Sequence, residues 1–397
     1  MSTGESEGKL KRAEWLMRPE TQRLMALLDG AQGRTRAVGG IVRDTLLGLS
    51  RESSDIDLAT ELVPDEVVAR ATRAGVAAYP TGIEHGTVTL RLDNLVAEVT
   101  TLREDVETDG RHALVRFGTS WKNDAARRDF TMNALYAGMD GTLFDPLGGL
   151  EDLMARRVRF IGNPEQRIAE DRLRVFRFFR FTASHGRELI DPEGYAACKA
   201  AAGTLGRLAA ERVGAEMRRM LSLPKVATTL AAMVRAGVMA LPEAAVALLQ
   251  TYERRASRPD FTGRLAILMS VVSPDDLQDR WRLSNEEMRI AAVVLAAAQL
   301  LGDFRINEAA YRYPASLGDA VEVAGVLSNW GEAGKAAVRE QLERLDVARF
   351  PLSGGDLIAA GFQPGPGLGA ELERLERAWI EGGFTLDREA LLRMARR

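Results

Sequence analysis

"GGIVRDTLLGLSRESSDIDLAT", residues 39–60, contains a glycine pair, a short helix pattern and two aspartates, in that order. The apolar residues around Asp55 and Asp57 predict a strand over 55–60, and side chains alternate along a strand with period 2. Both carboxylates should therefore point to one face, where they repel each other unless a cation lies between them.

The segment before the aspartates has the pattern of a phosphate-binding turn. Gly39 and Gly40 allow a tight turn after a strand over 35–40, and a helix over 41–48 would aim its N–H groups at a ligand. Arg43 can add a charge-assisted contact to phosphate, and the carboxylates suit Mg²⁺. This combination predicts metal-assisted nucleotidyl transfer. A glycine-rich turn followed by two surface aspartates is the alternative.

A second group of polar residues opens "RRDFTMNALY", residues 127–136, whose apolar run predicts a helix. Arg128 can bind a triphosphate, and Asp129 can accept a hydrogen bond from a ribose hydroxyl or orient Arg128. An Asp in the first turn of a helix is also ordinary helix capping, which is the alternative.

A third group lies in "AEDRLRVFRFFRF", residues 169–181, where Asp171, Arg174, Arg177 and Arg180 recur every three residues. This spacing predicts a polar stripe on one helix, beside an apolar stripe that faces a core. Cytosine and adenine each present an amino donor beside a ring-nitrogen acceptor, and an adjacent carboxylate and guanidinium complement that pair. Asp171 and Arg174 are therefore candidates to accept CTP and ATP and to reject UTP and GTP. An amphipathic helix supported by Asp–Arg pairs is the alternative.

Composition narrows the class of protein. The chain has 397 residues, 46% of them hydrophobic and 27% charged, with a formal net charge of −3. This composition is ordinary for globular proteins, and the chain is long enough for two or more domains. The single cysteine, Cys198, excludes a disulfide framework and a cysteine-based zinc site. The N-terminus lacks the apolar core of a signal peptide, which predicts a cytoplasmic location.

The order of the patterns predicts an α+β head followed by a helical remainder. Residues 1–20 read as a loose tail that leads into a helix over 21–30, and period-2 patterns predict strands over 86–92 and 95–102. The polar segment 103–122 reads as a loop. From about residue 165 onward the sequence is rich in Ala, Leu, Arg and Glu and predicts helices alone.

Taken together and in order, "GGIVRDTLLG", "DIDLAT", "RRDFTMNALY", "DPLGGLEDL" and "EDRLRVFRFFRF" resemble the class II tRNA nucleotidyltransferases. This family contains CCA-adding enzymes and bacterial poly(A) polymerases within the polymerase-β superfamily. The resemblance covers about residues 35–182. It implies a nucleotidyltransferase head with a small mixed or antiparallel sheet, followed by an all-helical neck, body and tail. The implied divisions are 1–20 (extension), 21–150 (head), 151–222 (neck) and 223–397 (body and tail).

The resemblance also implies roles for the candidate residues. Asp55 and Asp57 would hold Mg²⁺, and Glu98 is the weaker candidate for a third carboxylate, with an exposed surface glutamate as the alternative. The remaining residues would bind the nucleotide: Gly39, Gly40 and Arg43 at the triphosphate, Arg128 on the nucleotide, Asp129 near the sugar, Asp171 and Arg174 at the base edge, and Arg177 and Arg180 completing the pocket.

The implied reaction adds CMP and AMP from CTP and ATP to the 3′ end of tRNA, whose acceptor stem would lie along the helical part. A poly(A) polymerase, an enzyme that adds only CC or only A, and a non-catalytic RNA-binding protein are the alternatives. His85 is predicted to be structural, and Trp121 and Lys122 are too generic to assign. The family commonly has Pro where Arg172 stands, which leaves the geometry of the 169–181 helix open.

Overall fold

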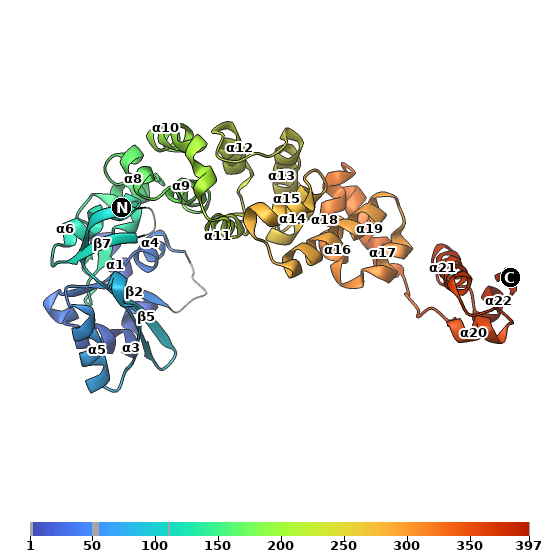
Figure 1. Ribbon diagram of the computed structural model, residues 1–397, viewed down its shortest axis with the longest axis horizontal. Helices are drawn as coiled ribbons and strands as arrows, with labels where there is room; N and C mark the ends of the chain where they lie inside the picture. Colours follow the sequence, from blue (N-terminus) through green and yellow to red (C-terminus); the bar gives the residue numbers. More distant parts are fainter. Residues whose placement is uncertain (1–2, 50–54, 110–111, 397) are drawn as a thin grey trace. The chain divides into compact units, whose positions relative to one another are not determined.

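A seven-stranded mixed sheet organises the N-terminal part of the chain (Figure 1). The computed structural model describes residues 3–49, 55–109 and 112–396. The strand order is β3-β4-β5-β2-β1-β8-β9. The bounds are β1 (Thr35–Val38), β2 (Ile56–Thr60), β3 (Ala77–Gly82), β4 (Thr87–Leu92), β5 (Leu95–Thr101), β8 (Tyr136–Ala137) and β9 (Leu143–Phe144).

Strand β2 lies in the middle of this sheet. It pairs antiparallel with β1 and parallel with β5, whereas the other named neighbours in the sheet are antiparallel. The predicted strands over 35–40, 55–60, 86–92 and 95–102 are confirmed, and so is the mixed sheet of an α+β head. Helix α4 (Gly40–Leu47) confirms the helix that follows the glycine pair, and α5 (Pro64–Arg73) connects β2 to β3.

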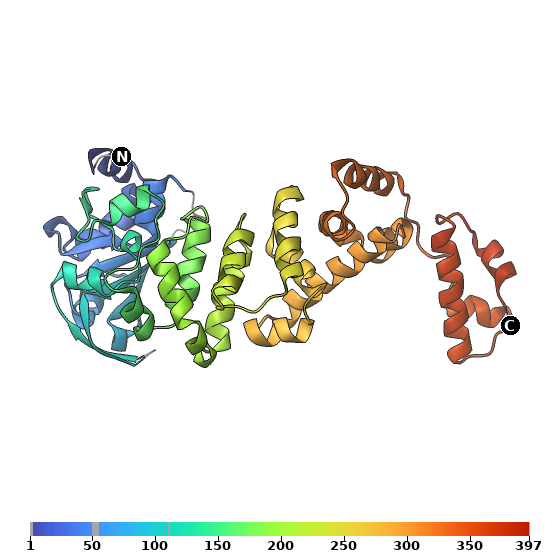
Figure 2. The ribbon, with the colours of Figure 1, turned by 90° about the horizontal axis from the view of Figure 1, so that it is seen from above.

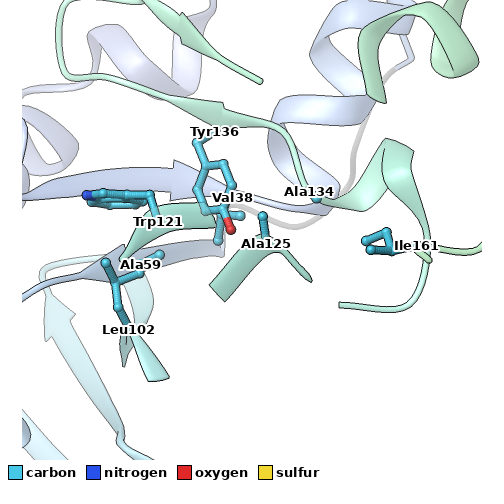
Figure 3. Close-up of a cluster of buried hydrophobic side chains, with 8 residues drawn as sticks. All are labelled: Val38, Ala59, Leu102, Trp121, Ala125, Ala134, Tyr136 and Ile161. Atoms are coloured by element: carbon cyan, nitrogen blue, oxygen red, sulfur yellow. The ribbon is translucent and has the colours of Figure 1, made fainter. Parts of the chain in front are cut away.

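A cluster of buried apolar side chains holds β1, β2 and β8 against helix α6 (Trp121–Ala126). Figure 3 shows the ring of Tyr136 between Trp121 and Ala125 and close to Val38, with Ala59 and Leu102 below Trp121. The Trp121 and Tyr136 rings meet edge to face with centroids 5.4 Å apart, a favoured geometry for aromatic pairs. Trp121 is thus a core residue, although its sequence context left it unassigned.

The expectation of a loose tail over residues 1–20 is wrong. Helices α1 (Thr3–Lys11), α2 (Glu14–Met17) and α3 (Pro19–Leu27) form there. Leu10 and Leu16 are buried, and the Trp15 indole donates a 2.8 Å hydrogen bond to the Thr45 hydroxyl on α4. Because the apolar residues are few and spread over two short helices, the segment reads as polar although it packs on the phosphate-turn helix.

Two further local expectations are wrong. The backbone of the expected loop 103–122 forms the antiparallel pair β6 (Arg103–Asp109) and β7 (His112–Phe117), followed by α6. The helix expected in the apolar run after Asp129 is a single 3₁₀ turn, η3 (Thr131–Asn133), and the chain then enters β8 at Tyr136. A buried sheet position at Tyr136 and Ala137 overrides the helical pattern of the sequence.

After β9 all the described regular elements are helices, as expected (Figure 2). No helix in the described part of the chain is long and apolar enough to cross a membrane. Two compact units form: Met1–Leu208 with Ala232–Met239, and Ala209–Ala231 with Ala240–Arg397. The helices are α7 (Gly149–Met154), α8 (Pro164–Glu170), α9 (Arg174–Ser184), α10 (Pro192–Ala201), α11 (Ala210–Leu221), α12 (Ala227–Arg235), α13 (Glu243–Arg255), α14 (Phe261–Met269), α15 (Pro274–Trp281), α16 (Asn285–Gly302), α17 (Ile306–Arg312), α18 (Leu317–Leu327), α19 (Glu332–Arg344), α20 (Gly354–Ala359), α21 (Pro366–Glu381) and α22 (Arg388–Met394).

Candidate active site

Three exposed carboxylates lie on or directly before the parallel strand pair at the centre of the sheet. Asp57 on β2 is the register partner of Glu98 on β5, and Asp55 immediately precedes β2. Register partners in a sheet point to the same face, so the Asp57 and Glu98 side chains share one surface. In the described part of the chain, no three His, Cys, Asp or Glu side chains already stand close enough together to form a metal site. The strands therefore offer a carboxylate pair rather than a closed cage.

The glycine turn lies directly beside this pair. Gly39 has φ 74° and ψ −129°, a conformation that strongly favours glycine, and it caps the N-terminus of α4. A Cβ atom on Gly39 would lie 3.9 Å from Oδ2 of Asp57. The positive end of the α4 dipole is therefore close to the carboxylates, in the arrangement that a phosphate and a divalent cation need together.

Arg43 lies on the first turn of α4 and is almost fully buried. Its Nε donates to Asp44 Oδ1 at 2.8 Å, and its Nη1 donates to Asn133 Oδ1 at 2.7 Å. The guanidinium carbon also lies 5.0 Å from the centre of the Phe181 ring. These two hydrogen bonds use two of the five N–H donors of the guanidinium, and its other donors suit a phosphate oxygen.

Asp129 contacts Arg177 rather than Arg128. Its Oδ2 accepts hydrogen bonds from Nε and Nη2 of Arg177 at 2.8 and 2.6 Å, and its Oδ1 accepts from the Asn133 amide at 3.0 Å. Burial acts to raise the pKa of Asp129, but Arg177 and these hydrogen bonds outweigh it and lower that pKa. The expectation that Asp129 orients Arg128 is wrong, and the residue it orients is Arg177.

Arg128 is held by two residues, Asp124 and Tyr136, that had no predicted role. Its Nη2 lies 3.1 Å from Asp124 Oδ2, and its Nε donates to the Tyr136 hydroxyl at 3.2 Å. That hydroxyl donates in turn to Asp124 at 2.8 Å. Burial acts to lower the pKa of Arg128, but the interactions with Asp124 and Tyr136 together outweigh it and raise that pKa. Asp124 and Tyr136 therefore fix the guanidinium of Arg128 on the α6 side of the site.

The segment 169–181 is two helices rather than one. Helix α8 ends at Glu170, Asp171 is its extended C-cap with φ −146°, and α9 begins at Arg174. The Asp171 carboxylate accepts a 3.1 Å hydrogen bond from the backbone N–H of Leu173. The backbone N–H of Arg174 donates to the Asp171 carbonyl at 3.0 Å. Asp171 therefore stands at the break that precedes the arginine stripe, not on the same helix.

The arginine stripe itself is confirmed on α9. Arg174 forms a 2.6 Å ion pair with Glu170 and donates to the Arg167 carbonyl at 2.9 Å. The Arg180 guanidinium lies 4.2 Å from the centre of the Phe181 ring, and that of Arg177 lies 5.4 Å from it. Arg177 and Arg180 of the stripe thus both contact Phe181, the ring that Arg43 also contacts.

His85 ends the 3₁₀ turn η2 (Ile83–His85) and its side chain is exposed. Its backbone carbonyl accepts a hydrogen bond from the Arg103 guanidinium. The prediction that His85 is structural stays a prediction.

Comparison with known families gives two matches along this chain. Residues 35–159 match the family described as the poly A polymerase head domain. Residues 189–248 match a family described as a probable RNA and SrmB-binding site of polymerase A. The first range contains the glycine turn, the three carboxylates, Arg128 and Asp129.

Similar proteins match over nearly the full length. The mitochondrial CCA tRNA nucleotidyltransferase 1 of Danio rerio is 33% identical over 400 residues, covering 97% of this chain and 92% of that protein. The CCA-adding enzyme of Limosilactobacillus fermentum is 33% identical over 389 residues, covering 94% and 95%. A crystal structure of the Bacillus stearothermophilus CCA-adding enzyme in complex with CTP aligns with a TM-score of 0.73 at 27% identity, covering 92% of this chain and 94% of that one.

Proposed function

The chain belongs to the family of CCA-adding enzymes, the tRNA nucleotidyltransferases, and from that premise we propose that it adds CMP and AMP from CTP and ATP to the 3′ end of tRNA. It is a nucleotidyltransferase, and the relatives that define the family process tRNA. The single observation that carries the proposal is the glycine turn at Gly39, set beside a carboxylate pair formed by Asp57 and Glu98.

The carboxylate arrangement fits a divalent metal ion. Enzymes of this nucleotidyltransferase family are generally metal-dependent. We propose Mg²⁺ as the metal, held by Asp55 and Asp57, with Glu98 as a third carboxylate. Mg²⁺ is commonly bound in proteins by one or two carboxylates together with substrate phosphates, so an exposed pair suits it better than a closed cage. When bound, the metal would neutralise charge on the phosphoryl oxygens and make the attacking hydroxyl more acidic.

The residues around the carboxylates would bind the nucleotide in three places. Gly39, Gly40 and Arg43 would contact the triphosphate at the N-terminus of α4, where N–H groups and the helix dipole favour an anion. Arg128 would bind the nucleotide from the α6 side, and Asp129 would lie near the sugar while it orients Arg177. The alignment of Arg128 by Asp124 and of Arg177 by Asp129 supports this assignment, because both guanidinium groups are held in place before a ligand arrives.

The base would be read at the break between α8 and α9. Asp171 and Arg174 present a carboxylate and a guanidinium to the amino donor and ring-nitrogen acceptor that cytosine and adenine share. Arg177 and Arg180 would complete the pocket. The extended backbone of Asp171 supports the role, because it brings this residue out of α8 and next to the first turn of α9.

The reaction is an in-line displacement at the α-phosphate. The 3′ oxygen of the tRNA forms a bond to the α-phosphorus, the bond to the pyrophosphate oxygen breaks, and the hydroxyl proton is lost to solvent. Within this step Arg43 and the α4 N–H groups would hold the departing pyrophosphate, which places donors where negative charge develops.

The helical remainder would bind tRNA. We propose that 151–222 acts as a neck and 223–397 as a body and tail along the acceptor stem. The match of residues 189–248 to a family described as an RNA-binding site supports this. Contacts of this kind are made largely to phosphates and to helix shape, so binding should weaken as salt rises. We also propose a cytoplasmic location, although relatives include mitochondrial proteins.

The experiment that tests the function offers the protein a tRNA that lacks its terminal CCA, together with all four nucleoside triphosphates and Mg²⁺. Sequencing the product should show CCA added once, after which addition stops. A long A run would identify a poly(A) polymerase, the second candidate, which the match to a poly A polymerase head favours. Addition of CC alone or A alone would identify a partial enzyme. An unchanged tRNA that still binds the protein would favour a non-catalytic RNA-binding role.

A further inference from the structure

A chain of buried polar side chains begins at the C-terminal end of α9. His185 caps this helix, and its Nε2 lies 3.1 Å from Oδ1 of Asp44 on α4. Its Nδ1 lies 2.6 Å from the Ser184 hydroxyl. The same Asp44 oxygen accepts the 2.8 Å hydrogen bond from Arg43 Nε. Asp44 thus joins the end of α9 to the residue that faces the phosphate turn.

The chain continues from Arg43 back to α9. Arg43 donates to Asn133 Oδ1 at 2.7 Å, and the Asn133 amide donates to Asp129 at 3.0 Å. Asp129 accepts both hydrogen bonds from Arg177, which is on α9. The two ends of the chain therefore lie on one helix, and the middle passes through α4 and η3.

Burial makes this chain a defined structure rather than a surface network. Arg43, Asp44, Asn133, Asp129 and His185 are each less than 10% exposed. Buried polar groups are costly when they lose hydrogen bonds, so the loss of one member removes a hydrogen bond from each neighbour and should let that neighbour shift. Those neighbours include Arg43 at the triphosphate and Arg177 at the base pocket.

The geometry points to His185, Asp44 and Asn133 as positioning residues. They hold the phosphate-turn helix α4 and the base-reading helix α9 in the relative position that nucleotide binding needs. This inference rests on the proposed function for the identity of the nucleotides. None of the three needs to touch the nucleotide. They act through Arg43 and Arg177, and the effect of removing them should appear in nucleotide affinity rather than in tRNA affinity.

His185 gives the most direct test, because it stands at the end of the hydrogen-bonded chain and reaches Arg43 only through Asp44. Burial lowers the pKa of His185 and favours its neutral form, so a neutral replacement removes a hydrogen bond without removing a charge. His185→Phe keeps the aromatic contact with Phe181, whose ring centre is 5.5 Å away, but cannot donate to Asp44. His185→Gln keeps a donor at the position of Nε2.

The measurement is calorimetric binding of CTP and of ATP to the full chain with Mg²⁺ present, alongside the KM for tRNA. His185→Phe should raise the Kd for CTP and the Kd for ATP by about fivefold or more, within the range expected for residues that couple two sites. His185→Gln should restore affinity to within about twofold of the unaltered protein. The KM for tRNA should stay unchanged in both. Tyr195→Phe is the matched control, since it removes one partly buried hydrogen bond, to the Ala232 carbonyl, in the same unit.

A second variant keeps the test decisive if His185→Phe does not fold. Asn133→Ala interrupts the hydrogen-bonded chain between Arg43 and Asp129 and should raise the Kd for CTP and for ATP by a similar factor. If both single variants fold, the double variant should weaken binding by less than the product of the two single effects, because the residues act in one chain.

The outcomes separate this inference from the proposed function. Wild-type affinity in folded His185→Phe or Asn133→Ala overturns the inference, as does failure of His185→Gln to restore binding. A protein that binds CTP and ATP with the expected variant effects, yet adds neither to tRNA, overturns the proposed function and supports the inference. A protein that binds neither nucleotide overturns both.

Discussion

At the scale of single residues, the carboxylate of Asp57 should be indispensable. Asp57→Asn keeps the size of the side chain but removes the charge beside the glycine turn, so nucleotide addition should fall by at least about a hundredfold. Glu98→Gln should cost about tenfold if Glu98 is a third carboxylate. Initial rates of CMP addition to tRNA lacking CCA measure both effects, and circular dichroism checks the fold.

Asp93→Asn is the matched control for these two variants. It makes the same chemical change, acid to amide, at the turn between β4 and β5, before the first residue of β5, where the positive φ of 53° suits Asn. Near-normal turnover of Asp57→Asn would contradict the metal-ligand assignment. If Glu98→Gln behaves like Asp93→Asn while Asp57→Asn is inactive, the result would contradict the role of Glu98 as a third carboxylate and leave the role of Asp57 intact.

A site residue could be predicted from the sequence when the residues that define its role lie near it in the sequence. Gly39 and Asp57 belong to a local pattern, a glycine turn and a strand, and local patterns are legible in the sequence. Asn133 and His185 carry no local signal of their link to α4, because Arg43 and Asp44 lie 90 and 141 residues away from them in the sequence. Residues of this second kind become visible only when the fold brings α4, η3 and α9 together.

At the scale of elements, strands whose apolar and polar residues alternate strictly were predictable. Short elements, and segments in which tertiary packing overrides the local sequence pattern, were not. The segments 86–92 and 95–102 alternate with period 2 and form β4 and β5 almost as expected. The segment 130–136 has a helical pattern, but Tyr136 and Ala137 are fully buried at the strand β8, and tertiary packing decides the conformation. The β6–β7 hairpin is polar and has no clear period, so its sequence resembles a loop.

The break between α8 and α9 makes a prediction about Arg172. The residue before a proline is restricted to extended conformations, and Asp171 already has φ −146° and ψ 106°. Arg172→Pro should therefore be tolerated and shift Tm by no more than about 2 °C, with unchanged preference for CTP and ATP. Scanning calorimetry and competition among the four nucleotides measure this.

A continuous helix over 169–181 would give the opposite result for the same variant. Proline in a helix interior costs about 3 kcal/mol or more, which corresponds to a loss of several degrees in Tm. Arg177→Pro is the contrasting variant: Arg177 is the fourth residue of α9, and its backbone N–H donates to the Leu173 carbonyl at 3.1 Å, so proline there should destabilise the helix. A large loss of stability in Arg172→Pro would contradict the two-helix description.

At the scale of the whole molecule, each compact unit has its own buried polar support. The unit that contains the sheet has the chain from His185 to Arg177, described above. The other unit, Ala209–Ala231 with Ala240–Arg397, is built around Arg264, which is fully buried. Arg264 pairs with Glu253 at 2.8 Å and donates to the Leu221 and Pro224 carbonyls at 2.8 and 3.0 Å. The sequence predicted helices here but gave no sign of this arginine, because a buried charge depends on partners from other helices.

Arg264→Ala should destabilise the second unit alone. Removing one member of a buried ion pair costs about 3–5 kcal/mol, because the Glu253 carboxylate stays buried without its cation. We expect denaturant unfolding in two steps, with only the step of the second unit moved to lower denaturant and with CTP affinity unchanged. Arg289→Ala is the matched control: its pair with Glu286 is exposed on α16, where solvent screening leaves a salt bridge little effect on stability. An equal shift of both steps, or a loss of CTP binding in Arg264→Ala, would mean that the two units do not unfold independently.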